Sequence, residues 1–394
     1  MRPLTDVLVL DFGRFVAAPS AAQQLRSLGA DVIKIEPLPA GDPARRQPRP
    51  TAGPHPSGSA FIAYNSGKRS IALDLRSPLV RPVLERLVER ADVLIEGFRP
   101  GVMSRMGFPP DKARADNSQL VYASLRGFNG DSEQRRAVDG IIQAESGIMA
   151  VNGDGNGPPT KVGFPVTDIC CGLALTQAVL VALLNRSKTG IGDVIEISLL
   201  DAALYIQSGM LLECLTTGIE PKRLGNTAAL AAPSDAYQAA DGFVVLSAYL
   251  ERDWTAFVEL IEREDLLSDP RFSSDEARLK HTVELKFEIE SVLRGNTMMY
   301  WVERFQAADL MASPVRSYGE VLALARSGET TVLAGVEPGR PQIGLPYRLG
   351  DVDQPSYSPA PRLGQQTRDV LLEVGFEPSY IETLIDRGVA MATE

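Results

Sequence analysis

The sequence predicts an α/β protein with a parallel sheet at its core, and two observations carry this prediction. Five short apolar runs are rich in β-branched residues, and segments with helical periodicity separate them. That alternation is typical of parallel strands joined by crossover helices. The predicted strands are residues 7–11, 32–36, 93–96, 120–124 and 194–198.

The first predicted helix supports the same fold. Residues 20–28 carry apolar side chains at helical spacing and end at Gly29, a residue type that commonly stops helices. Such a βαβ unit is Rossmann-like. The turn after the first strand, residues 13–19, has one glycine where the dinucleotide fingerprint needs three, so no NAD or FAD site is predicted.

The character of the sequence changes near residue 220. One predicted strand and three helix-like segments follow, which indicates a second, smaller α+β domain. They are residues 242–248 for the strand and residues 254–264, 275–293 and 298–308 for the helices. Alternation returns near Ser317. The tail, residues 367–389, has the pattern of two short helices separated by Gly375 and Pro378.

Composition narrows the class of protein. The chain has 394 residues, 44% of them hydrophobic, and a net charge of −10, which argues against a nucleic-acid-binding surface. Cys170 and Cys171 are adjacent and Cys214 is remote, so no disulfide framework is indicated and a cytoplasmic location is expected. The longest apolar stretch, residues 173–184, is too short for a membrane span, and the N-terminus has no signal pattern.

Chemistry in this chain must depend on carboxylates, because it has only two histidines. His55 lies in a Pro/Gly/Ser-rich loop, residues 41–58, and His281 in a charged segment. Cysteines and histidines also lack the spacing of zinc ligands. Asp168 is conspicuous because it precedes a helix-like apolar segment, residues 169–184.

Two interpretations of Asp168 remain open at this point. Thr167 or Asp168 at the N-cap of that helix would accept backbone N–H bonds and complement the helix dipole. Alternatively, a carboxylate at such a turn can attack an acyl group while backbone donors stabilise the developing oxyanion. The two roles are compatible.

Three turns carry cations. Residues 65–70 include Lys68, residues 97–101 are followed by Arg105, and Arg136 precedes Asp139. Backbone amides and basic side chains in turns beside strand ends suit phosphate groups. A solvated turn, or a surface ion pair near Arg136, explains each motif equally well.

Taken in chain order, these pieces resemble the class III CoA-transferase family. This family includes carnitine and formyl CoA-transferases and a racemising branch, α-methylacyl-CoA racemase. The resemblance covers essentially the whole chain. Besides Asp168, the matching residues are 7–11, 28–36, 65–73, 91–96, 98–101, 105–108, 143–147, 193–198, 201–203, 240–242, 314–315 and 363–364.

The resemblance implies a fold and a mechanism. It implies a large Rossmann-like domain from both chain ends, a smaller α+β domain from the middle, and an interlocked homodimer. The expected boundaries are 1–200 for the first part of the large domain, 201–224 for a linker, 225–316 for the small domain and 317–394 for a linker and the remainder. Asp168 is then the nucleophile that takes an acyl group from acyl-CoA, and CoA passes to a small carboxylic acid. Coenzyme A is a substrate, and no permanently bound metal or redox cofactor is implied.

The resemblance also implies site residues. Asp139 corresponds to a second active-site carboxylate, and Arg136 stands where formyl CoA-transferases have lysine. The positions that correspond to CoA contacts are Val16, Ala17, Asn65, Lys68, Gly97, Phe98, Arg99, Arg105 and Arg136.

Two departures from the family pattern bear on the reaction. Val138 replaces the histidine with which the racemase branch moves a proton at the α-carbon, so racemisation lacks its partner. Residues 225–233 contain one glycine where formyl CoA-transferases have a run, which argues against formyl or oxalyl substrates. A CoA-transferase is therefore predicted. The alternatives are an acyl-CoA racemase of the same fold and a catalytically silent CoA-binding protein.

Overall fold

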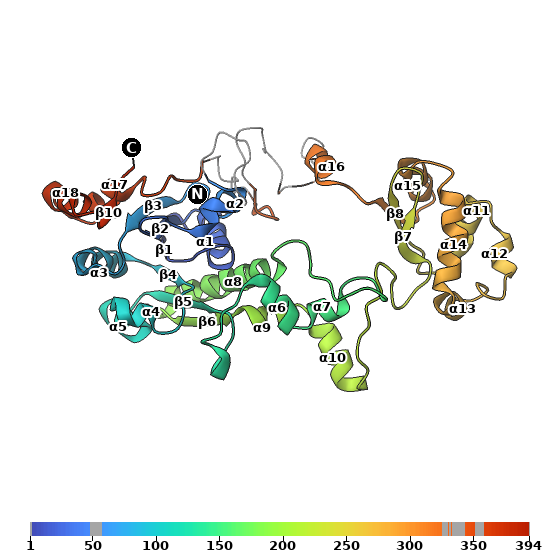
Figure 1. The fold of residues 1–394 in the computed structure, drawn as a ribbon, viewed down its shortest axis with the longest axis horizontal. Coiled ribbons are helices and arrows are strands. Elements are labelled where there is room, and N and C mark those ends of the chain that lie inside the picture. Colours follow the sequence, from blue (N-terminus) through green and yellow to red (C-terminus); the bar gives the residue numbers. More distant parts are fainter. Residues whose placement is uncertain are drawn as a thin grey trace. The chain divides into compact units, whose positions relative to one another are not determined.

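The chain forms two compact units (Figure 1), and the computed structural model describes residues 2–47, 57–324, 330, 332, 343–350 and 358–393. The first unit comprises residues 1–146, 162–216 and 324–394, and the second comprises residues 147–161 and 217–323. His55 and part of the predicted loop at 41–58 lie outside the described residues, as does part of the segment after 317.

The first unit is built on a seven-stranded sheet with the order β10-β3-β2-β1-β4-β5-β6. All neighbouring strands pair in parallel except β10 and β3. The predicted mixed α/β fold with a mostly parallel sheet is confirmed. The strands are β1 (Leu8–Asp11), β2 (Asp31–Pro37), β3 (Arg69–Leu73), β4 (Val93–Glu96), β5 (Val121–Arg126), β6 (Val194–Ser198) and β10 (Ala390–Met391).

Two strands of this sheet were not predicted. β3 begins with Arg69 and Ser70, whose polar side chains hide the apolar pattern. In the fold these side chains have partners on β2, because the Ser70 hydroxyl donates to Glu36 Oε1 at 2.6 Å and Arg69 pairs with Asp31. β10 has two residues, too few for any sequence pattern.

The helices of the first unit connect and cover these strands. They are α1 (Ala17–Ser27), α2 (Ser59–Asn65), α3 (Arg81–Arg90), α4 (Val102–Met106), α5 (Pro110–Asp116), α6 (Asp139–Glu145), α8 (Val166–Thr189), α9 (Leu199–Tyr205), α10 (Ser208–Thr217), α17 (Thr367–Glu373) and α18 (Pro378–Asp386). Short 3₁₀ turns lie at Pro43–Arg46, Pro78–Val80 and Gly130–Ser132.

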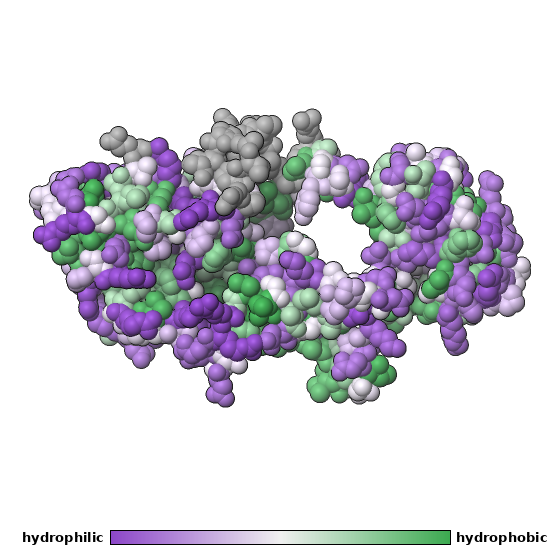
Figure 2. Space-filling model, in the orientation of Figure 1, coloured by the Kyte–Doolittle hydropathy of each residue, from purple (hydrophilic) through white to green (hydrophobic). Residues whose placement is uncertain are grey.

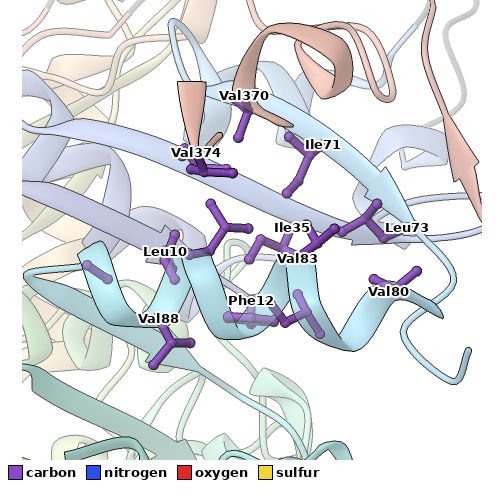
Figure 3. Close-up of a cluster of buried hydrophobic side chains, with 14 of the residues drawn as sticks. Leu10, Phe12, Ile35, Ile71, Leu73, Val80, Val83, Val88, Val370 and Val374 are labelled. Atoms are coloured by element: carbon purple, nitrogen blue, oxygen red, sulfur yellow. The ribbon is translucent and has the colours of Figure 1, made fainter. Parts of the chain in front are cut away.

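One face of the sheet carries a continuous apolar core. Figure 3 shows side chains of the strands, such as Leu10 and Ile71, meeting Val83 of α3 and Val370 of α17. The C-terminal helices thus pack into a core begun by the first strand. Folding of this unit therefore requires both ends of the chain.

The opposite face of the sheet is covered by α1 and α8. Successive strand residues point to opposite faces, so buried Val9 lies on this side. A methyl group on Gly172 would clash with Ser20 Oγ and lie 2.9 Å from the Ala17 carbonyl oxygen. Glycine is therefore what lets α8 lie directly against the first turns of α1.

Helix α8 is longer than the predicted segment 169–184. Its 24 residues are long and apolar enough to cross a membrane, as are α9 and α10 together if their 71° bend is ignored. The buried core helix of a soluble protein meets the same criteria, and α8 packs on α1, β5 and β6. No membrane span is inferred from it.

The second unit has an antiparallel three-stranded sheet, ordered β7-β8-β9, against which helices pack. The predicted helix at 275–293 is two helices, because the chain breaks at His281 between α13 and α14. The elements are α7 (Ile148–Val151), β7 (Ser234–Gln238), β8 (Phe243–Ser247), α11 (Glu251–Leu260), α12 (Asp265–Ser268), α13 (Asp275–Lys280), α14 (Thr282–Leu293), α15 (Met298–Ala307), β9 (Met311–Pro314) and α16 (Tyr318–Ala323).

Residues 147–161 group with the second unit, whereas the expected boundaries left them in the large domain. Arg223 gives the physical reason. Its guanidinium donates to the carbonyl oxygens of Ala150, Asp154 and Gly157 at 3.0 to 3.3 Å, which ties this loop to the chain that enters the second unit. No sequence pattern signals such long-range backbone bonds.

Candidate active site

Asp168 lies in the first turn of α8, on the first unit. The helix begins at Val166, and the N-cap residue, Pro165, makes no side-chain capping bond. The interpretation of Thr167 or Asp168 as the N-cap residue is therefore wrong, because the helix starts before both of them. Asp168 shares a face of α8 with Gly172, one turn later, and that face lies against α1.

The environment of Asp168 favours its protonated form. Burial, and then the nearby charge of Asp139, raise the pKa of Asp168 from 3.8 to about 7. A carboxyl group with such a pKa changes its charge near neutral pH. Strongly perturbed carboxylates of this kind gather at catalytic sites.

Asp139, the first residue of α6, is held rigidly beside Asp168. Its Oδ1 accepts hydrogen bonds from the backbone N–H of Thr167 at 2.8 Å and from the Thr167 hydroxyl at 2.7 Å. Its Oδ2 accepts a third, from Gln143 Nε2 at 2.6 Å. Gln143 Oε1 in turn accepts the backbone N–H of Val162 at 2.8 Å, just before α8. The network fixes the negative charge of Asp139 against the start of α8.

Sequence reasoning missed three residues of this cluster. Gln143 lies four residues after Asp139, a helical spacing that places both side chains on one face and could have revealed it. Thr167 had been considered only as a cap. Tyr64, on α2, had no signal in the sequence, yet burial and then the charge of Asp168 raise the pKa of its hydroxyl.

The predicted residues near the first strand lie where the strand order reverses. β1 and β4 are parallel neighbours in the sheet. After β1 the chain continues to β2 on one side of this pair, and after β4 it continues to β5 on the other side. α1 starts at Ala17 after β1, and Gly97 follows β4. Crevices at such reversal points are the usual ligand sites of open α/β sheets. A Cβ on Gly97 would meet only Ala18 among the described residues, at 4.0 Å, so open space adjoins this glycine.

Phe98 is held in this crevice by neighbouring charges. Its N–H donates to Glu96 Oε2 at 2.8 Å, and its carbonyl accepts from Arg126 at 3.2 Å. The Arg14 guanidinium lies 5.3 Å from the centre of its ring. The basic side chain of Arg14, after β1, and the aromatic ring of Phe98, after β4, thus face each other where the strand order reverses.

The predicted basic residues fall into two groups. Arg99, Arg105 and Arg136 are exposed, and their side chains form no hydrogen bond or ion pair with the described part of the chain. Lys68 is buried instead, and its ammonium donates to Asp11, Asn65 and Pro19. Asn65 is equally buried. The structure therefore brings the first group to the surface and Lys68 and Asn65 into the protein interior.

Val138 stands at the N-cap of α6 and is 63% exposed. It carries no proton that could be exchanged with a substrate. The carboxylates Asp139 and Asp168 thus lack a basic partner at this position.

Comparisons with known proteins identify the family of this chain. The sequence profile of CoA-transferase family III matches residues 4–367. A probable fatty acyl-CoA transferase, Rv3272, from Mycobacterium tuberculosis is 34% identical over 92% of this chain and 96% of its own. An acetyl-CoA:oxalate CoA-transferase from Acetobacter aceti is 33% identical over 92% of this chain and 94% of its own. Among solved structures, a CAIB/BAIF family protein from Brucella suis superposes with a TM-score of 0.87 at 30% identity, covering 94% of this chain and 99% of that one.

Proposed function

The chain belongs to CoA-transferase family III and is a CoA-transferase, and from this premise we propose that Asp168 is its covalent nucleophile. The observation that carries the proposal is the half-buried Asp168 carboxyl group beside the fixed charge of Asp139. The pKa of about 7 leaves roughly half of the Asp168 side chains ionised at neutral pH. A desolvated carboxylate is also a stronger nucleophile than a hydrated one.

The proposed reaction has four steps. The Asp168 carboxylate attacks the thioester carbonyl of the donor, which gives an acyl-aspartyl anhydride and releases CoA thiolate. The thiolate attacks the aspartyl carbonyl, which gives an aspartyl-CoA thioester and frees the donor acid. The acceptor carboxylate attacks this thioester, forming a second anhydride and CoA thiolate. The thiolate then takes the acceptor acyl group, and Asp168 is regenerated.

Asp139 has a supporting role in this proposal. Three donors already occupy its carboxylate, so it is poorly placed to shuttle protons. Its negative charge instead destabilises the Asp168 carboxylate, so the nucleophile starts from a higher free energy before it attacks. The first-turn N–H groups of Val166 and Thr167 already donate to the Phe164 carbonyl and to Asp139, so neither is an open donor for a developing oxyanion.

We place CoA at the crevice between β1 and β4. The open space at Gly97 supports this placement, as do the guanidinium groups of Arg99 and Arg105, which have no partner among the described residues, because CoA is rich in phosphate. Asp168 lies close by, since the N-terminal half of α8 packs on the start of α1.

The decisive experiment is direct. Wild-type protein is incubated with an acyl-CoA without acceptor, and the peptide that contains Asp168 is examined by mass spectrometry for a CoA thioester. Asp168→Asn and Asp168→Ala should form no adduct and show no acceptor-dependent exchange. Full transfer by either variant would overturn the assignment. Incorporation of solvent deuterium at the α-carbon without any acceptor would instead indicate a racemase. Binding of CoA with neither reaction would indicate a catalytically silent CoA-binding protein.

We also propose that the working form is an interlocked homodimer in the cytoplasm. None of the ten residues of α10 is buried, and Leu212 and Leu215 are 60% and 82% exposed. Apolar side chains gather over α10 on the surface (Figure 2), as they do where another chain packs. Light scattering of the purified protein tests this: a monomer at micromolar concentration would contradict it.

A further inference from the structure

Four buried charged side chains lie beneath the turn between β1 and α1. They are Asp11 on β1, Lys34 on β2, Asp42 in the following loop and Lys68 just before β3. Lys68 Nζ lies 2.7 Å from Asp11 Oδ2, and Lys34 Nζ lies 3.0 Å from Asp42 Oδ2, with every one of these side chains at most 1% exposed. Lys34 and Asp11 are 3.6 Å apart, which joins the two pairs.

Such a network is not explained by stability alone. Taking four charges out of water costs about as much as their mutual attraction returns, and apolar residues of similar size often serve stability better. Burial by itself lowers the pKa of Lys34, but Asp11 and Asp42 raise it above its ordinary value. The lysine stays charged because both carboxylates face it.

Each member of the network bonds to the backbone of the turn. Gly13 is held twice, because its N–H donates to Asp11 Oδ1 at 2.8 Å and its carbonyl accepts from Lys34 Nζ at 3.0 Å. The Phe15 N–H donates to Asp42 Oδ1 at 3.1 Å. The Pro19 carbonyl, in the first turn of α1, accepts from Lys68 Nζ at 2.9 Å. The network therefore fixes the path of the chain from Gly13 to Pro19.

The turn needs this support because its backbone is strained. Phe15 has a φ of 63°, in the left-handed region that is unfavourable for a residue with a Cβ. The result is that Arg14 and Phe15 point outward, with the Arg14 guanidinium over Phe98, and that α1 starts at Ala17 without a side-chain cap. The four buried charged side chains thus determine the shape of the β1–α1 turn, which forms one wall of the crevice between β1 and β4.

We propose that Asp11, Lys34, Asp42 and Lys68 are positioning residues, which hold the β1–α1 turn in the shape that receives the phosphate-bearing end of acyl-CoA. The proposal rests on the placement of CoA at this crevice. Lys68 does not itself touch CoA, because its three N–H bonds are taken by Asp11, Asn65 and Pro19. Its effect on CoA binding is exerted through the turn.

The test compares two thioester substrates in two variants. Asp42→Asn and Lys34→Met each weaken the network without touching the exposed surface. With acyl-CoA, each should raise KM about tenfold, the effect of losing one charge-assisted hydrogen bond, while kcat stays within about twofold. With an acyl-pantetheine, which lacks the nucleotide phosphates, kcat/KM should equal that of the wild type. Asp92→Asn is the matched control, because Asp92 also accepts a backbone N–H and pairs with Arg186, but lies at the opposite ends of the strands.

An unchanged KM for acyl-CoA in a folded variant, or an equal loss with both thioesters, would overturn the proposal. A crystal structure of the wild type with CoA gives a second test that needs no variant. Lys68 Nζ should stay beyond hydrogen-bonding distance of every phosphate oxygen while residues 13–19 contact the ligand, and a direct Lys68–phosphate bond would refute the role assigned to it. Failure of the proposed function is seen separately, as the absence of any Asp168 adduct in the wild type.

Discussion

The pH dependence of the first chemical step follows from the position of Asp168. Its pKa of about 7, against an ordinary 3.8, corresponds to about 4 kcal/mol of free energy opposing ionisation. Only the ionised form attacks a thioester. The rate of adduct formation at saturating acyl-CoA should therefore rise about fivefold from pH 6 to pH 7, then about twofold more, and level off.

Asp139→Asn separates the two causes of that pKa. Burial is the larger cause of the raised pKa and Asp139 the smaller. Removing the charge of Asp139 should therefore lower the free energy that opposes ionisation of Asp168 by less than half, which is less than about 2 kcal/mol. The midpoint of the rate profile should fall but stay above about pH 5.5. Rapid-quench measurement of the Asp168 adduct between pH 5 and 9, without acceptor, gives both midpoints.

The control lies on the same helix. Glu145→Gln removes an exposed carboxylate of α6 that pairs with Arg135, and it should leave the midpoint unchanged. A wild-type rate that is flat from pH 5 to pH 8, or an Asp139→Asn midpoint equal to that of the wild type, would refute the reasoning.

Three further predictions concern stability and binding. Because the pKa of Asp168 is raised in the folded protein, its contribution to stability is present below pH 3.8 and is lost as the pH rises through 7. Asp168→Asn should therefore raise the unfolding free energy by about 1–4 kcal/mol at pH 8 but not at pH 4. Equal denaturation midpoints of the variant and the wild type at pH 8 would contradict this. Gly172→Ala should cost about 2–3 kcal/mol in urea unfolding because the methyl group meets Ser20 and Ala17, whereas Gly209→Ala, a helical glycine with nothing within 4 Å, should be neutral or stabilising. Gly97→Val should weaken CoA binding at least tenfold in calorimetry with little loss of stability, since its side chain enters space that the chain leaves open, and unchanged affinity would argue against CoA in this crevice.

Much of the site could be predicted from the sequence because its residues stand beside regular elements. The strand at 93–96 coincides with β4, because a short apolar run that is buried on both faces of a sheet gives a strong signal. The strand at 194–198 coincides with β6, whose β-branched residues indicate a strand although Glu196 interrupts the run. Asp168 stood out because histidines are scarce and an apolar helix follows it. Gln143, which donates to Asp139, was missed as a site residue, although its spacing of four residues from Asp139 indicates a shared helix face.

The surroundings of charged residues could not be predicted in the same way. Lys68 looked like an exposed turn lysine, and only the fold reveals that it is buried against Asp11, which is 57 residues earlier in the chain. Likewise, nothing local signals that Arg223 binds the loop at 150–157. Burial and long-range partners depend on which strands become neighbours.

The sequence by itself determined the fold class, the family resemblance and the choice of Asp168 as the candidate nucleophile, because these follow from local periodicity and from residue types at fixed spacing. The tertiary structure decided the chemical state of those residues. It set the pKa of Asp168 through burial and Asp139, buried Lys68 against Asp11 and Pro19, and placed the β1–α1 turn beside Gly97. The physical reason is that electrostatic free energies depend on distance and on solvent exclusion, and both are properties of the folded chain.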